Sequence, residues 1–151
     1  VHRDLKPENV VLVRADGRKN LVKLLDFGLA TAQSVTRLTQ AGMIMGTISY
    51  LSPEQITDGR VTAASDLYSL GVLAYELLTR EKPFPGETPT EVIRKVLGGL
   101  PVPPAALRAG IPAALEGLVL ALLSKEPSSR PDDATVVARL GELLSAYPER
   151  P

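Results

Sequence analysis

The chain has 151 residues, of which 44% are hydrophobic and 23% charged, a composition typical of a folded globular domain and not of a disordered chain. Seventeen basic and seventeen acidic residues give a formal net charge of zero, which disfavours a general attraction to nucleic acid or to an anionic membrane surface. The chain has no cysteine and one histidine, which excludes disulfides and thiolate metal sites and argues against a zinc site.

The apolar segments are short, and the longest, residues 118–123, is too short to cross a bilayer. The chain opens on Val1 and a charged cluster, without a methionine or a leader peptide. We therefore expect it to be part of a longer protein. The expected location of this part is cytoplasmic, although the parent protein could be tethered to a membrane through another segment.

The first part of the chain predicts strands. Residues 10–13 form an apolar run rich in β-branched side chains, residues 21–25 form a second, mainly apolar run, and residues 15–18 between them favour a turn, so we expect a β-hairpin. Residues 28–51 have weak periodicity and predict a long loop, and loops of this length are commonly functional.

The remainder predicts helices. Residues 67–79, preceded by capping residues at 62–66, are apolar on nearly every face, which is typical of a buried helix. Three prolines between residues 83 and 89, and three more between 101 and 104, predict rigid loops. Three further segments predict helices, and the last carries an apolar stripe: 90–97, 113–123 and 132–144. The expected fold class is α+β, mostly α, with a small hairpin and a helical bundle around one buried helix.

The strongest chemical signal is the sequence HRDLKPEN at residues 2–9. It resembles the catalytic loop of the eukaryotic-like, bacterial-type Ser/Thr protein kinases. Phosphoryl transfer depends on positioning and charge neutralisation. The resemblance implies that Asp4 accepts the proton of the substrate hydroxyl and that Lys6 offsets the charge of the γ-phosphate. It also implies that Asn9 binds Mg²⁺ through its amide oxygen.

A second signal is the sequence DFG at residues 26–28, which follows the second predicted strand and lies 22 residues after Asp4. Alone, such a sequence is ordinary turn chemistry. In this position it resembles the kinase motif in which Asp26 binds Mg²⁺ and Phe27, followed by Gly28, sets an active or inactive arrangement. Val11 matches the family position beneath the adenine of ATP, or is an ordinary core valine.

Residues 46–54, GTISYLSPE, resemble the end of a kinase activation segment. The resemblance implies that Thr47 bridges Asp4 and Lys6 when a substrate docks. It also implies a buried ion pair between Glu54 and Arg130, although two exposed and unrelated charges are the ordinary alternative.

Asp66 opens the predicted buried helix. The resemblance implies that its carboxylate binds backbone N–H groups near His2 and Arg3, and a plain helix cap is compatible with the same position. Arg3, directly before Asp4, offers a partner for a phosphate on Thr36 or Thr39 that would order the loop, unless these are simply solvated hydroxyls.

These motifs predict a Ser/Thr protein kinase that transfers the γ-phosphoryl of ATP, with Mg²⁺, to protein substrates. Residues 1–147 would form the C-terminal lobe of the domain, and residues 148–151 the start of a linker. The sequence contains no GxGxxG loop and no strand lysine ahead of His2, so we expect the isolated chain to be inactive and to need the N-terminal lobe of the same domain as its partner.

Two alternative functions remain open. One is a pseudokinase or protein-binding module that uses the same lobe, and the other, weaker, is a small-molecule phosphotransferase. The balanced charge and the short apolar segments predict no contact with nucleic acid or with a membrane in this segment.

Overall fold

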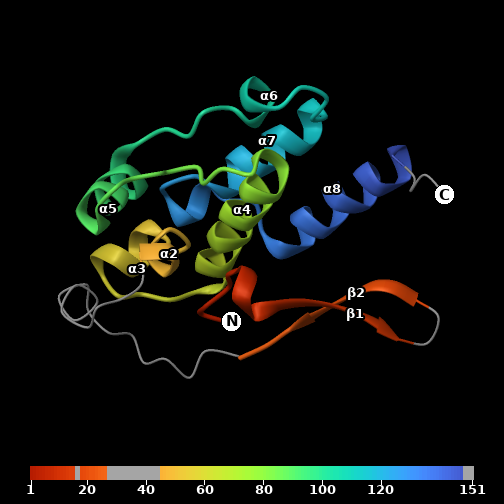
Figure 1. The fold of residues 1–151 in the computed structure, drawn as a ribbon, viewed down its shortest axis with the longest axis horizontal. Coiled ribbons are helices and arrows are strands. Elements are labelled where there is room, and N and C mark those ends of the chain that lie inside the picture. Colours follow the sequence, from red (N-terminus) through yellow and green to blue (C-terminus); the bar gives the residue numbers. More distant parts are fainter. Residues whose placement is uncertain (16–17, 27–44, 148–151) are drawn as a thin grey trace.

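The computed structural model describes residues 1–15, 18–26 and 45–147 of the chain. A two-stranded hairpin comes first and is followed by helices, in the order η1 (Pro7–Asn9), β1 (Val10–Ala15), β2 (Arg18–Leu24), α2 (Met45–Ile48), α3 (Pro53–Thr57), α4 (Ala63–Thr79), α5 (Pro89–Gly98), α6 (Pro104–Leu107), α7 (Ala113–Leu122), η2 (Pro127–Ser129) and α8 (Asp133–Ala146). Figure 1 shows the hairpin extending to one side of the helices, with α4 running through their middle. The expected α+β, mostly α class is confirmed.

The predicted hairpin is confirmed as an antiparallel pair of β1 and β2. Val10 pairs with Leu24 and Val13 with Leu21, and the register shifts between Val13 and Ala15. The strands carry exposed apolar side chains, with Leu12 at 65% of its full exposure. The hairpin therefore adds little to the core. What matters for function is where it places the residues before β1 and after β2.

Helix α4 is the centre of the core, as the apolar segment predicted. Tyr68, Val72 and Tyr75 are almost completely buried along it. The helix begins after Thr62, whose backbone N–H donates to Ser65 Oγ at 3.1 Å. Gly71 permits a close approach to α7, because a Cβ there would lie 2.8 Å from Leu122 Cβ. Burial is not uniform along α4, since Leu77 near its end is 72% exposed.

Two clusters of buried side chains make up the core of the described residues. The larger joins α4 to the segment around α2 and α3 and to α5, and includes Tyr68, Tyr75 and Phe84. The smaller joins α7 to α8 through Leu118, Leu122 and Val136. The segment of residues 45–57 is thereby packed against α4 and α5. Because Asp66 of α4 also binds the start of the chain, α4 fixes the place of this segment relative to that start.

The structure corrects several predicted boundaries. Met45–Ile48 is a short helix inside the segment predicted as loop, most of which lies outside the described residues. Pro89 and Pro104 begin helices α5 and α6 instead of lying in loops, because proline fits the first helical turn, where an N–H has no partner. The stripe on α8 is only partly buried, since Val136 faces the core while Val137 and Leu144 are each 70% exposed.

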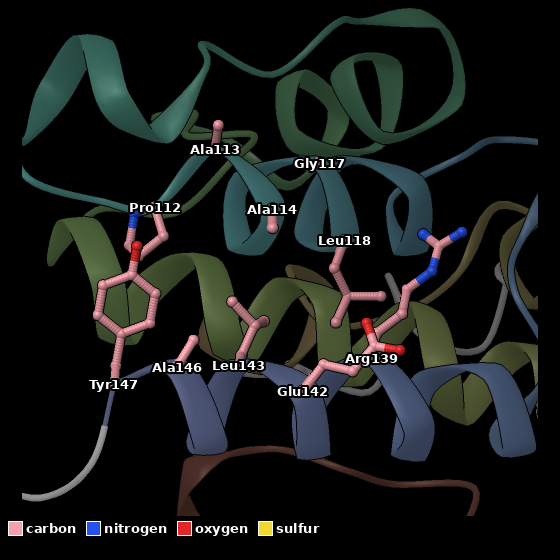
Figure 2. Close-up of a pocket in the computed structure, with 10 residues that line it drawn as sticks. All are labelled: Pro112, Ala113, Ala114, Gly117, Leu118, Arg139, Glu142, Leu143, Ala146 and Tyr147. Carbon is pink, nitrogen blue, oxygen red and sulfur yellow. The ribbon is translucent and has the colours of Figure 1, made fainter.

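A groove of about 730 Å³ runs between α7 and α8. Figure 2 shows Leu118 of α7 and Leu143 of α8 facing one another across it, with Tyr147 at one end and Arg139 at the other. Its residues are distinct from those singled out by the sequence motifs. Among the described residues, every helix is too short or too polar to cross a membrane.

Candidate active site

Asp66, in the first turn of α4, binds the backbone at the start of the chain. Its Oδ2 accepts a hydrogen bond from His2 N at 2.6 Å, and its Oδ1 accepts one from Arg3 N at 2.8 Å. Arg3 has a φ of 75°, in the left-handed region that costs a residue with a side chain about 1–3 kcal/mol. The Asp66 carboxylate thus holds a strained backbone immediately before Asp4.

His2 connects this segment to the end of β2. Its imidazole is buried, and Nε2 donates to the carbonyl oxygen of Leu25 at 2.9 Å. Leu25 directly precedes Asp26, so this bond ties the segment before Asp4 to the segment that carries Asp26.

Asp4, Lys6 and Asn9 form one polar cluster. Lys6 Nζ lies 2.8 Å from Asp4 Oδ2. Asn9 Nδ2 donates to the Asp4 carbonyl at 2.8 Å and to Asp4 Oδ2 at 3.1 Å. Asn9 is buried, whereas the Asp4 and Lys6 side chains keep 30% and 19% of their exposure. The cluster is held by a buried amide and presents a carboxylate and an ammonium group to solvent.

The hairpin brings Asp26 to the same end of the fold as Asn9. Val10 pairs with Leu24, and Leu25 N donates to Asn9 O at 2.9 Å, so the residues before β1 lie beside those after β2. Asp26 is exposed, and its φ of 48° is again left-handed. Because Asn9 uses its amide nitrogen on Asp4, its amide oxygen is available as a ligand.

An amide oxygen and a carboxylate are the hard oxygen donors that Mg²⁺ prefers. This cation commonly takes one or two protein ligands together with substrate phosphates. The donor set of Asn9 and Asp26 therefore fits Mg²⁺.

The structure ties Thr47 and Val11 less closely to the cluster of Asp4, Lys6 and Asn9. Thr47 lies in α2 and is partly exposed, and within the described part of the chain no hydrogen bond joins its hydroxyl to Asp4 or Lys6. Val11 is a partly exposed residue of β1 opposite Lys23, outside both core clusters of the described residues.

Glu54 and Arg130 form a buried bidentate ion pair. Arg130 Nη1 and Nη2 donate to the two carboxylate oxygens, each at 2.8 Å, and Ser65 Oγ donates to Oε1 at 2.7 Å. The Arg130 guanidinium carbon also lies 4.9 Å from the centre of the Tyr68 ring. Burial alone would raise the pKa of Glu54, but the hydrogen bonds from Arg130 and Ser65 outweigh it and lower the pKa to about 2. Glu54 and Arg130 therefore form a buried pair and are not two exposed, unrelated charges.

Arg130 also binds backbone carbonyl oxygens from separate parts of the fold. The partners are Ala64 at 2.7 Å, Ser124 at 2.9 Å and Lys125 at 3.0 Å. The pair therefore fastens α3, the start of α4 and the segment after α7 to one another.

Four residues with expected roles lie outside the described residues, namely Phe27, Gly28, Thr36 and Thr39. The regulatory hypothesis for Arg3 depends on the last two and stays a prediction. Arg3 itself is exposed and directly precedes Asp4.

One contact between the motif segments was not predicted. The Tyr50 hydroxyl donates to Glu76 Oε2, and the Tyr50 carbonyl accepts from Ser69 Oγ at 2.7 Å. Burial, followed by the hydrogen bond to Glu76, raises the pKa of Tyr50. These bonds fasten the segment after Thr47 to α4. The available signal was Glu76, the one carboxylate of α4 beyond its first turn, in a mainly apolar stretch.

The chain matches known proteins over most of its length. The model of the protein kinase domain matches residues 1–139. Serine/threonine-protein kinase PknB of Mycobacterium tuberculosis H37Rv is 42% identical over 132 residues, which cover 86% of this chain and 20% of PknB. Serine/threonine-protein kinase PknL of the same strain is 42% identical over 134 residues, which cover 89% of this chain and 33% of PknL.

This chain thus spans about a fifth to a third of the length of these relatives. The family match covers every motif residue from His2 to Arg130. The chain therefore belongs to the protein kinase family and is of the bacterial Ser/Thr type.

Proposed function

We propose that the protein carrying this chain transfers the γ-phosphoryl group of ATP to serine or threonine hydroxyls of proteins. The observation that supports this proposal is the cluster of Asp4, Lys6 and Asn9, which the hairpin brings beside Asp26. A protein kept only for binding has no need of all these charge-handling side chains, so this cluster favours catalysis over the pseudokinase alternative.

Asp4 would orient the substrate hydroxyl and accept its proton, since its carboxylate is partly exposed and held by Asn9. Lys6 would neutralise charge on the transferred phosphoryl group, and Thr47 would bridge Asp4 and Lys6 once a substrate docks. Asn9 and Asp26 would hold Mg²⁺, and Val11 would lie under the adenine. When bound, Mg·ATP supplies the phosphoryl group and neutralises the charge on its oxygens.

Residues 1–147 would act as the C-terminal lobe of the catalytic domain, with the N-terminal lobe as partner. No GxGxxG loop occurs among the 151 residues, so we propose that they do not turn over ATP by themselves. Phosphorylation of Thr36 or Thr39 would order the activation segment through Arg3. Alanine at both positions should lower the activity of the intact protein, and full activity would contradict this part of the proposal.

The decisive experiment compares wild-type intact protein with Asp4→Asn in a peptide phosphorylation assay. Loss of the general base should lower kcat by about 100-fold or more while ATP binding persists. Asp58→Asn, at an exposed helix end, is the matched control and should keep wild-type kcat. Equal kcat for Asp4→Asn and wild type would contradict the proposed function.

A further inference from the structure

Lys82 is held at a fixed place in the loop between α4 and α5. The residues that follow it, Pro83 and Phe84, are buried, and Phe84 belongs to the larger core cluster. Ahead of it, Glu81 N donates to Thr79 Oγ1 at 3.1 Å, and Arg80 turns the backbone through a left-handed conformation. The side chain of Lys82 therefore starts from an anchored backbone.

The ammonium group of Lys82 reaches the segment that carries Thr47. Its Nζ lies 3.5 Å from Gly46 O, 3.4 Å from Ser49 Oγ and 5.3 Å from the centre of the Tyr50 ring. Two of these contacts are at the long limit of a hydrogen bond, and all three partners are neutral. A cation that binds only neutral groups retains capacity for a charged acceptor.

The ion pairs of the described residues leave Lys82 without a carboxylate. These pairs are Lys6–Asp4, Lys95–Glu91 and Arg130–Glu54. Lys82 is also partly buried, so that its charge is less screened than that of a fully exposed lysine.

A cavity of about 360 Å³ opens beside Lys82. Its lining combines the segment around Thr47 with the start of α5 and the loop before it: Gly46, Ser49, Glu81, Lys82, Pro85, Gly86 and Val92. The cavity is large enough to admit an acidic side chain, and its lining offers apolar contacts from Pro85 and Val92 for the stem and a cation, Lys82, for the charged end. Among the described residues of the lining, Glu81 is the one carboxylate, and it weakens the attraction for an anion.

We propose that this cavity binds an aspartate or glutamate side chain of the protein substrate, with Lys82 as its charge partner. The inference rests on the proposed function, because Gly46 and Ser49 flank Thr47 and a substrate held there would pass the cavity. Lys82 is thus a specificity-determining residue that makes this kinase favour serine or threonine in an acidic context.

The test is a positional peptide library phosphorylated by the intact kinase. Within each variant, kcat/KM for an acidic residue is divided by kcat/KM for alanine at the same position, so a general change in activity cancels. The wild-type ratio should reach about fivefold at one position, as expected for one partly exposed charge pair. The ratio should fall to about one in Lys82→Met. In Lys82→Glu, kcat/KM should instead be higher for lysine or arginine than for alanine at that position.

Two control variants sharpen this test. Arg94→Met removes an exposed cation from α5, outside the cavity lining, and should keep the wild-type ratio. Glu81→Gln removes the opposing charge and should raise the ratio. An unchanged ratio in Lys82→Met, or a wild-type enzyme that is active without any acidic preference, would overturn the inference while leaving the proposed function intact.

A phosphorylated residue has related chemistry, so the library includes phosphoserine at each position. A phosphoserine preference more than tenfold above that for aspartate and glutamate would overturn the commitment to a carboxylate. Failure of the wild-type protein to phosphorylate any peptide would overturn the proposed function, and this inference with it.

Discussion

The carboxylate of Glu54 accepts two hydrogen bonds from the guanidinium of Arg130, which lies 76 residues further along the chain. Both side chains are buried, and the pair connects α3 to the segment that follows α7. Removing one member of such a pair leaves an uncompensated buried charge, which costs about 3–5 kcal/mol. The pair is therefore a sensitive test of how this lobe is held together.

The first prediction concerns acid stability. The pKa of Glu54 is lowered from 4.5 to about 2, so its contribution is present above pH 4.5 and is lost as the pH falls toward 2. Urea unfolding of the intact protein should therefore show a stability loss of about 3 kcal/mol from this residue over that range. In Glu54→Gln this component should be absent, with lower stability at pH 7. Parallel pH profiles for the variant and the wild type would contradict the prediction.

The second prediction concerns Asp66. In Asp66→Asn one of the two acceptors for the amides of His2 and Arg3 is replaced by an NH₂ group, and the strained backbone of Arg3 loses a bond. We expect kcat to fall about tenfold or more, with a smaller effect on the free energy of unfolding. Asp133→Asn, on the exposed start of α8, provides the control. A kcat within twofold of wild type for Asp66→Asn would show that these two bonds do not position Asp4.

The third prediction concerns Arg80, which ends α4 with a φ of 64° and donates its N–H to Glu76 O at 2.7 Å. Glycine adopts this left-handed conformation without the steric cost that a Cβ imposes. Arg80→Gly should raise the free energy of unfolding by about 1 kcal/mol in urea titrations. Arg80→Ala keeps a Cβ and should give no such increase. Equal effects of the two substitutions would contradict the explanation.

The fourth prediction compares two tyrosines of α4. The Tyr68 hydroxyl is buried and has no hydrogen-bond partner among the described residues, whereas the Tyr75 hydroxyl donates to Val102 O at 2.8 Å. Tyr68→Phe should raise the free energy of unfolding by about 1 kcal/mol, because an unsatisfied polar group leaves the core. Tyr75→Phe should lower it by about the same amount. If Tyr68→Phe destabilises the protein as much as Tyr75→Phe, the hydroxyl of Tyr68 has a partner.

Local patterns were sufficient for most of the fold. The short apolar runs at residues 10–13 and 21–25, with a turn between them, predicted the hairpin, and the apolar segment at 67–79 predicted α4. The errors were at prolines and at segments with weak periodicity. Pro89 and Pro104 were interpreted as loop residues although they begin helices, since the same fixed φ suits both settings. The stripe at residues 136–144 predicted α8 but not the exposure of Val137 and Leu144.

The chain's membership of the protein kinase family was determined by the sequence alone. The residue types at 2–9, 26–28 and 46–54 belong to chemistry that has few alternatives at that spacing, and the family match covers all of them. Such motifs are local in sequence, so they can be recognised without knowing which distant segments are in contact.

The resemblance implied the pairing of Asp66 with the start of the chain and of Glu54 with Arg130, but only the tertiary structure decided the other long-range contacts. Glu76 accepts from Tyr50, Arg130 also binds the Ala64 carbonyl, and Lys82 lies beside the segment that carries Thr47. A single carboxylate or ammonium group in a sequence is compatible with solvent, with a helix cap or with a buried partner. Its partner depends on which helix faces it after packing, because burial strengthens those charge interactions that packing brings within hydrogen-bond distance.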